Sequence, residues 1–178
     1  MKPTDTNENN LPAPKGLNIT ESKTKLEYIM SSYRQILYHI VFRTKDSLKT
    51  LHLENSEELY KYIWGVVKGK NGVLYRINGM EEHIHILSDL HPSIALADYL
   101  RDMKTASSIW LKECGKFPQF NGWADGYAAF TYAYSDKETV VNYIKNQREH
   151  HKKTTFEEEL RKLLIEHGVE INEKFFRD

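Results

Sequence analysis

Two histidines one residue apart, His83 and His85, are the side chains in this sequence that most directly suggest metal chemistry. They lie in the short apolar run 83–87, which is typical of a buried strand. Alternate side chains of a strand point to the same face, so the two imidazoles are expected side by side. Neighbouring imidazoles chelate divalent metal ions. The chain has eight histidines, however, and one such pair is expected by chance roughly one time in three.

Tyr143 and Gln147 form a second pair, one helical turn apart. A tyrosine can form a phosphoester, but its phenol has a free pKa of about 10 and needs activation. The amide oxygen of glutamine suits hard cations such as Mg²⁺ or Mn²⁺. Val140 and Ile144 share the same helical stripe. Taken alone, the pattern is explained more simply by a packing role for Tyr143 and a solvated Gln147.

Basic and aromatic side chains surround this pair in the sequence. The basic run on and just beyond the helix is Lys145, Arg148, His150, His151, Lys152 and Lys153. Such a stripe suits phosphate groups, and a solvated helix end accounts for it equally well. The aromatic residues before the helix are Trp123, Tyr127, Phe130, Tyr132 and Tyr134. Aromatic rings stack on unpaired bases, but most of these are expected in the core because they lie on a strand.

The overall composition is that of a globular protein, with 40% hydrophobic and 28% charged residues and a formal net charge of zero. Zero net charge counts mildly against nucleic-acid binding but allows a local basic stripe. Cys114 is the one cysteine, which excludes an internal disulfide and favours a reducing, cytoplasmic compartment. No apolar run is long enough to span a membrane, and residues 1–16 lack the apolar segment of a secretory signal.

Hydrophobic periodicity predicts the elements that position these residues. Strands are expected at 35–42, 73–77, 83–87 and 127–134. Helices are expected to follow the first and third strands, and two more to follow the fourth. This order predicts an α+β, ferredoxin-like split βαβ fold, with an antiparallel sheet and helices on one face. An added C-terminal helix carries Tyr143, and the second face of the sheet is expected to be free for a site or a partner.

Several turns and helix ends are also predicted from short motifs. Asn78-Gly79 is typical of a tight turn. Ser135 with Glu138, and Thr154 with Glu157, have the spacing of capping boxes, and Gly168 is expected to end the last helix.

Four segments occur in an order that makes the sequence resemble a known family. They are 38–45 (YHIVFRTK), 83–87 (HIHIL), 123–127 (WADGY) and 143–147 (YIKNQ). Together they resemble the single-tyrosine HUH transposases of small insertion sequences and their REP-associated relatives, over roughly residues 33–151. The chain differs from the family in its Glu81-Glu82 pair and in its N-terminal extension.

The resemblance implies a site and a reaction. His83, His85 and Gln147 match the family's metal ligands, for Mg²⁺ or Mn²⁺, and Tyr143 matches the nucleophile. Family members cut single-stranded DNA beside hairpins, form a 5′-phosphotyrosine and rejoin ends as homodimers, with no nucleotide cofactor. Predicted DNA-binding residues are Arg43, Lys104, Lys145, Arg148, Lys152 and Lys153.

The expected organisation has three parts. Residues 1–30 form a polar extension without order, 31–153 the catalytic domain, and 154–178 a C-terminal helical extension. We expect a cytoplasmic, nucleoid-associated protein. Two alternatives stay open, namely a domesticated hairpin-binding protein that no longer transposes DNA, and a metal-dependent hydrolase that activates water.

Overall fold

The computed structural model of the chain describes residues 33–176, apart from the side chains of Lys174 and Phe175. The predicted extension at residues 1–30 lies outside the described residues. The strands are β1 (Leu37–Arg43), β2 (Leu74–Gly79), β3 (His83–Ser88) and β4 (Ala128–Tyr132). The helices are α2 (Ser56–Gly69), α3 (Leu96–Glu113), α4 (Lys137–Lys145), α5 (Gln147–His150) and α6 (Phe156–Glu166). None of these helices is long and apolar enough to cross a membrane.

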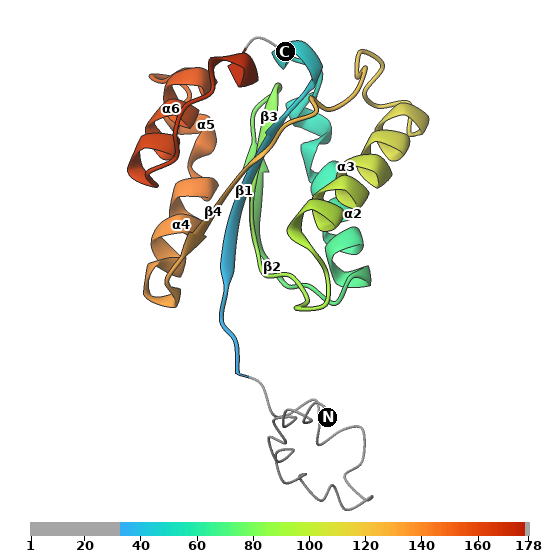
Figure 1. The fold of residues 1–178 in the computed structure, drawn as a ribbon. Helices are drawn as coiled ribbons and strands as arrows, with labels where there is room; N and C mark the ends of the chain where they lie inside the picture. Colours follow the sequence, from blue (N-terminus) through green and yellow to red (C-terminus); the bar gives the residue numbers. More distant parts are fainter. Residues whose placement is uncertain (1–32, 177–178) are drawn as a thin grey trace, which may run out of the picture. The chain divides into compact units, whose positions relative to one another are not determined.

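The four strands form one antiparallel sheet in the order β2-β3-β1-β4. Helices α2 and α3 pack together on one face of this sheet (Figure 1). The main core lies between these two helices and the sheet. There Ile40 and Ile84 of the sheet meet Leu59 and Met103 of the helices. The predicted ferredoxin-like α+β fold is therefore confirmed.

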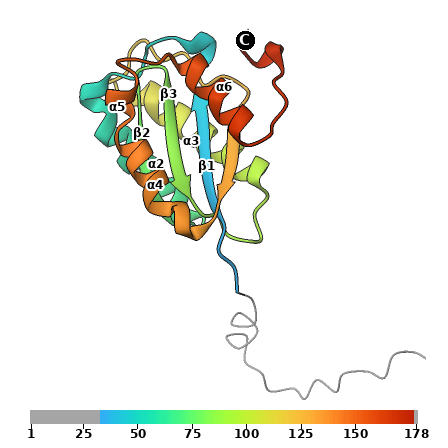
Figure 2. The same cartoon turned by 90° about the vertical axis from the view of Figure 1, so that its left-hand side faces the viewer.

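The second face of the sheet is covered by α4, α5 and α6 (Figure 2). The expectation of a free face was wrong, and the reason is the apolar residues on it. Val140 and Ile144 of α4 pack on Leu37 and Leu87, and Leu160 and Leu163 of α6 pack on Val41 and Phe130. Because apolar strand surface is unfavourable in water, this face also takes a helical layer.

The predicted turn at Asn78-Gly79 is wrong, because both residues lie within β2. The chain reverses one residue later, where Met80 N–H donates to the carbonyl of His83 at 2.9 Å. Gly79 is needed for this close approach, since an added Cβ would lie 2.2 Å from the carbonyl oxygen of His83. A glycine can therefore mark a close backbone approach as well as a turn.

The helix carrying Tyr143 was predicted as continuous through Gln147, but it breaks at Asn146 between α4 and α5. Asn78 Nδ2 donates to the carbonyls of Ile144 at 3.0 Å and Lys145 at 2.9 Å. In an unbroken helix those carbonyls would accept amides four residues ahead. The side chain of Asn78 thus satisfies the end of α4 and fixes the direction in which the chain leaves it.

Two predicted capping boxes are wrong and the predicted stop at Gly168 is confirmed. Asp136 caps α4 without a side-chain hydrogen bond, because residues 134–136 form a short 3-10 turn first. The second box is shifted by one residue to Thr155 and Glu158. Gly168 has a φ of +66° just beyond α6, which is a conformation that favours glycine.

Candidate metal and nucleophile site

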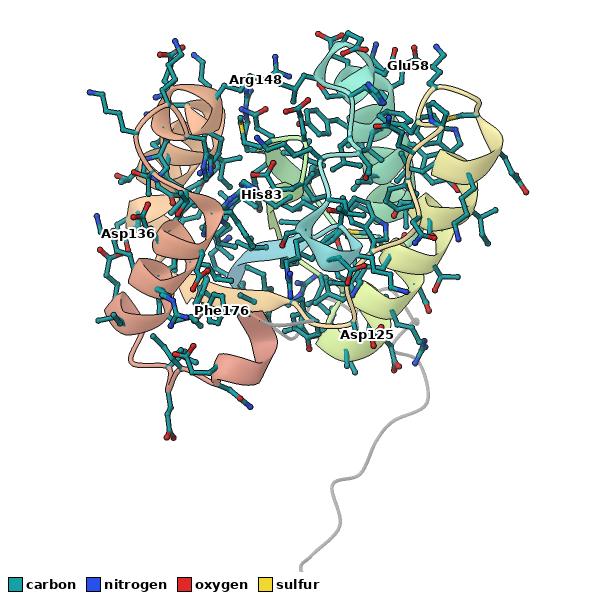
Figure 3. The ribbon with its side chains drawn as sticks, turned by 90° about the horizontal axis from the view of Figure 1, so that it is seen from above. Glu58, His83, Asp125, Asp136, Arg148 and Phe176 are labelled. Carbon is teal, nitrogen blue, oxygen red and sulfur yellow. The ribbon has the colours of Figure 1, made fainter. Side chains whose placement is uncertain are left out.

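His83 and His85 lie side by side on β3 and face the layer of α4, α5 and α6. Ile84, between the two histidines, and Ile86, after them, point into the core beneath α2 and α3. In Figure 3, His83 lies on the side of the sheet toward these C-terminal helices, whereas Asp125 lies on the side of α3. Both histidines are fully buried, so the sheet fixes the positions of both imidazoles.

Each of the two imidazoles is held through its Nδ1 atom. His83 Nδ1 lies 3.2 Å from the Glu82 carboxylate, and His85 Nδ1 lies 3.0 Å from Nε2 of His39. A carboxylate accepts hydrogen bonds, so Nδ1 of His83 carries the proton and its Nε2 presents a lone pair. Among the described residues, the Nε2 atoms of His83 and His85 have no hydrogen-bond partner. This is the arrangement typical of histidines that bind a metal.

Tyr143 and Gln147 reach the same place despite the break between their helices. The ring of Tyr143 lies 6.1 Å from that of His85, measured between centroids. The Tyr143 hydroxyl donates to a carboxylate oxygen of Glu159, and Gln147 Nε2 donates to the same oxygen at 2.7 Å. Gln147 is fully buried, and its Oε1 has no hydrogen-bond partner within the described residues. The four predicted site residues are therefore together in one chain.

Glu159 of α6 lies at the centre of the site, although the sequence analysis did not single it out. Its side chain is 2% exposed. Its Oε2 lies 3.0 Å from Nε2 of His151, 3.3 Å from that of His85 and 3.8 Å from that of His83. One signal was available, because Glu159 falls within the stripe of Phe156, Leu160 and Leu163. An acidic residue on an apolar helix face is seldom buried without a partner.

The first turn of α6 is anchored over the site in two ways. The ring of Phe156 stacks on His83, with centroids 4.4 Å apart. Thr155 and Glu158 form a capping box in which each side chain accepts from the other's backbone amide. These contacts hold Glu159 in register with the histidines of β3.

Burial and close partners change the acid–base properties of the site. Burial lowers the pKa of His83 to about 4, against the opposing hydrogen bond to Glu82, so His83 is neutral at neutral pH. Burial acts to raise the pKa of Glu159, but the hydrogen bond from His151 and the nearby imidazole of His85 outweigh it and hold this pKa well below its usual range. Burial, and then Glu159, raise the pKa of Tyr143. The phenol is therefore protonated while it contacts the carboxylate.

The site has the composition of a metal centre. Four possible ligand atoms lie within 4.8 Å of one another, one each from His83, His85, His151 and Glu159. Neutral imidazole nitrogens and an ionised carboxylate oxygen are ordinary ligands for divalent transition metals. The orphaned Nε2 atoms and the orphaned Gln147 Oε1 are buried polar atoms that an ion would satisfy.

Four of the predicted DNA-binding residues lie within ten positions of Tyr143 in the sequence. Lys145, Arg148, Lys152 and Lys153 are exposed, and Arg148 donates to Ser56 Oγ at 2.9 Å. Lys152 and Lys153, in the segment after α5, line two hollows. One, of about 580 Å³, is also lined by Tyr143, and the other, of about 440 Å³, by Glu82 and His151.

The other two predicted DNA-binding residues are placed differently. Arg43 pairs with His83 in the β1–β3 register, but it is buried and donates to Ser47 Oγ at 2.7 Å. Lys104 lies on α3, on the far side of the sheet, where it donates to the carbonyl of Asp125 at 2.8 Å. The structure does not bring Lys104 to the site.

The fold and the site define an α+β domain that presents a histidine pair and a tyrosine in one buried cluster. The sequence matches the family model described as "Transposase IS200 like" over residues 32–147, so the chain belongs to the IS200-like transposase family. This is a family of enzymes that cut and rejoin DNA. A search of curated proteins found no match.

Two solved structures have a similar fold. One is a candidate transposase from Deinococcus radiodurans R1, at 22% identity and a TM-score of 0.51, covering 65% of this chain and 93% of that one. The other is a REP-associated tyrosine transposase bound to a REP hairpin, at 18% identity and a TM-score of 0.51, covering 68% of this chain and 74% of that one. At these identities the likeness concerns the fold.

Proposed function

We propose that the protein is a metal-dependent transposase that cuts and rejoins single-stranded DNA beside a hairpin, with Tyr143 as the nucleophile. The observation that carries this proposal is the state of the predicted ligand atoms. His83 Nε2, His85 Nε2 and Gln147 Oε1 are all buried and lack hydrogen-bond partners within residues 33–176. Membership of the family and the hairpin-bound structural relative support the choice of substrate.

His83, His85 and Gln147 would hold the metal, Mg²⁺ or Mn²⁺. When bound, the metal supplies a Lewis acid that offsets charge on the scissile phosphate. The Tyr143 phenol loses its proton to water as its oxygen bonds to phosphorus, and the bond to the 3′-oxygen breaks. The products are a 5′-phosphotyrosine and, after protonation, a 3′-hydroxyl. The phosphoester keeps the energy of the broken bond, so rejoining needs no nucleotide.

The chain's own residues prepare this reaction. Glu82 and His39 fix the rings of His83 and His85. Lys152 and Lys153 offer cations for the DNA backbone at the hollows beside the site. The ligand atoms are covered by α6, so DNA binding requires the segment 151–159 to move aside.

The experiment is incubation with single-stranded hairpin DNA from the flanks of the gene, plus Mn²⁺, followed by denaturing electrophoresis. We expect a covalent protein–DNA adduct that is lost in Tyr143→Phe while hairpin binding persists. The matched control is Tyr134→Phe, because Tyr134 is 58% exposed and near the start of the same helix. Cleavage by Tyr143→Phe at the wild-type rate would instead indicate a hydrolase that activates water. Hairpin binding without cleavage would indicate a domesticated binding protein.

A further inference from the structure

The metal site draws on residues beyond those that match the family. We propose that Glu159 of α6 and His151 of the preceding turn are metal ligands in the DNA-free protein, together with His83 and His85. This inference rests on the proposed function, because it concerns the same site. The family match ends at residue 147, so neither added ligand lies within it.

The spacing of the four ligand atoms is that of groups sharing one ion. The Glu159 Oε2 atom lies 3.0 Å from Nε2 of His151, 3.3 Å from that of His85 and 3.8 Å from that of His83. Two neighbouring ligands on one ion lie about 3.0–3.4 Å apart when each bond is about 2.1 Å long. The four atoms therefore need only small adjustments to surround a metal.

The orientation of His151 supports its role as a ligand. Its Nδ1 lies 2.8 Å from the carbonyl oxygen of Thr154. A carbonyl oxygen can only accept, so Nδ1 carries a proton and Nε2 is the nitrogen that donates to Glu159 Oε2, at 3.0 Å. A metal bound here would take the place of the Nε2 proton. Glu82 imposes the same orientation on His83. A cation between these Nε2 atoms and the Glu159 carboxylate would bind the nitrogen lone pairs once the shared proton has left.

Burial gives a second, independent reason. Glu159 is 2% exposed, and within residues 33–176 the ion-pair contacts of its carboxylate are all with histidines, which carry charge only when protonated. A buried carboxylate needs a counter-charge. A divalent ion supplies that charge and also satisfies the orphaned nitrogens of His83 and His85. Three imidazoles with one carboxylate favour Mn²⁺ over Mg²⁺, because imidazole suits transition metals.

The first test is a Mn²⁺ titration of the DNA-free full chain by calorimetry. Glu159→Gln should weaken Mn²⁺ binding at least about 100-fold, more than the loss of an outer-sphere contact. The matched control is Glu158→Gln, one residue earlier on the same helix, where glutamine can still complete the capping box. Its Mn²⁺ affinity should equal that of the wild type, and circular dichroism checks that each variant is folded.

The second test counts the ligands directly. X-ray absorption at the manganese edge should detect three imidazoles in the wild-type protein and two in His151→Ala. The inference would be overturned if Glu159→Gln and His151→Ala both kept wild-type Mn²⁺ affinity while His83→Ala lost binding. That result would leave the proposed function intact. Adduct formation by Tyr143 is measured separately with DNA, so its failure would count against the proposed function alone.

Discussion

The Nε2 atom of His39 lies 3.0 Å from the Nδ1 atom of His85, and both rings are fully buried. The rings are partly stacked, with centroids 5.2 Å apart. His39 is therefore placed to set which nitrogen of His85 carries a proton and where Nε2 points.

We expect His39→Ala to weaken Mn²⁺ binding by about 10- to 100-fold, because Nδ1 of His85 loses its partner. His39→Gln should restore part of the affinity, since an amide can still bond to Nδ1. Calorimetry measures both variants. Wild-type affinity in His39→Ala would mean that β3 alone orients His85.

Removing the side chain of Asn78 should destabilise the fold and disturb the site. Asn78→Ala loses two hydrogen bonds to the end of α4, at about 1 kcal/mol each. The total of about 2 kcal/mol should lower Tm by roughly 4–8 °C for a chain of this size. Calorimetric unfolding measures the shift. Asn142→Ala, on the exposed side of α4, should have little effect, and equal losses in both variants would refute a capping role for Asn78.

Gly79→Ala should be far more damaging than Gly65→Ala. At Gly79 a Cβ meets backbone atoms of His83 and Ile84, whereas at Gly65 nothing lies within 4 Å. We expect Gly79→Ala to cost roughly 1–3 kcal/mol or more. Gly65→Ala should be neutral or stabilising by up to about 1 kcal/mol, because alanine favours a helix. Urea denaturation of both variants tests this, and a stable Gly79→Ala protein would show that the turn at 80–82 can relax.

Adding Mn²⁺ should raise the Tm of the DNA-free protein, and EDTA should reverse the rise. Binding to the folded state alone adds about 2.7 kcal/mol of stability when the free ion is at 100 times its Kd. A thermal-shift titration measures this. In His83→Ala the shift should disappear, and an undiminished shift there would place the bound ion elsewhere.

Much of the fold followed from the sequence because its signals are local. The alternation of His83, Ile84 and His85 determines which side chains share a face, and β3 has the alternation that was predicted. The ends of elements were less predictable. Asn78-Gly79 has the composition of a turn, but pairing with β3 and the bonds from Asn78 to α4 keep it extended.

The parts of the site that the sequence analysis missed depend on tertiary contacts. Glu159 lies 74 positions after His85, and only the packing of α6 on Val41 and Phe130 brings its carboxylate to the imidazoles. In the sequence His39 resembles an ordinary strand residue, because its contact with His85 depends on the register in which β1 pairs with β3. The predicted contact of Lys104 with DNA stays untested. Lys104 lies on the far side of the sheet from Tyr143.

The most direct test of the central claim is mass spectrometry of the covalent adduct after digestion with trypsin. The tryptic peptide 138–145, between Lys137 and Lys145, contains Tyr143 as its single tyrosine. We predict that this peptide carries the 5′-linked nucleotide when wild-type protein reacts with hairpin DNA and Mn²⁺. Cleaved DNA with a free 5′-phosphate and an unmodified peptide 138–145, or a nucleotide on another peptide, would contradict the assignment of Tyr143 as the nucleophile.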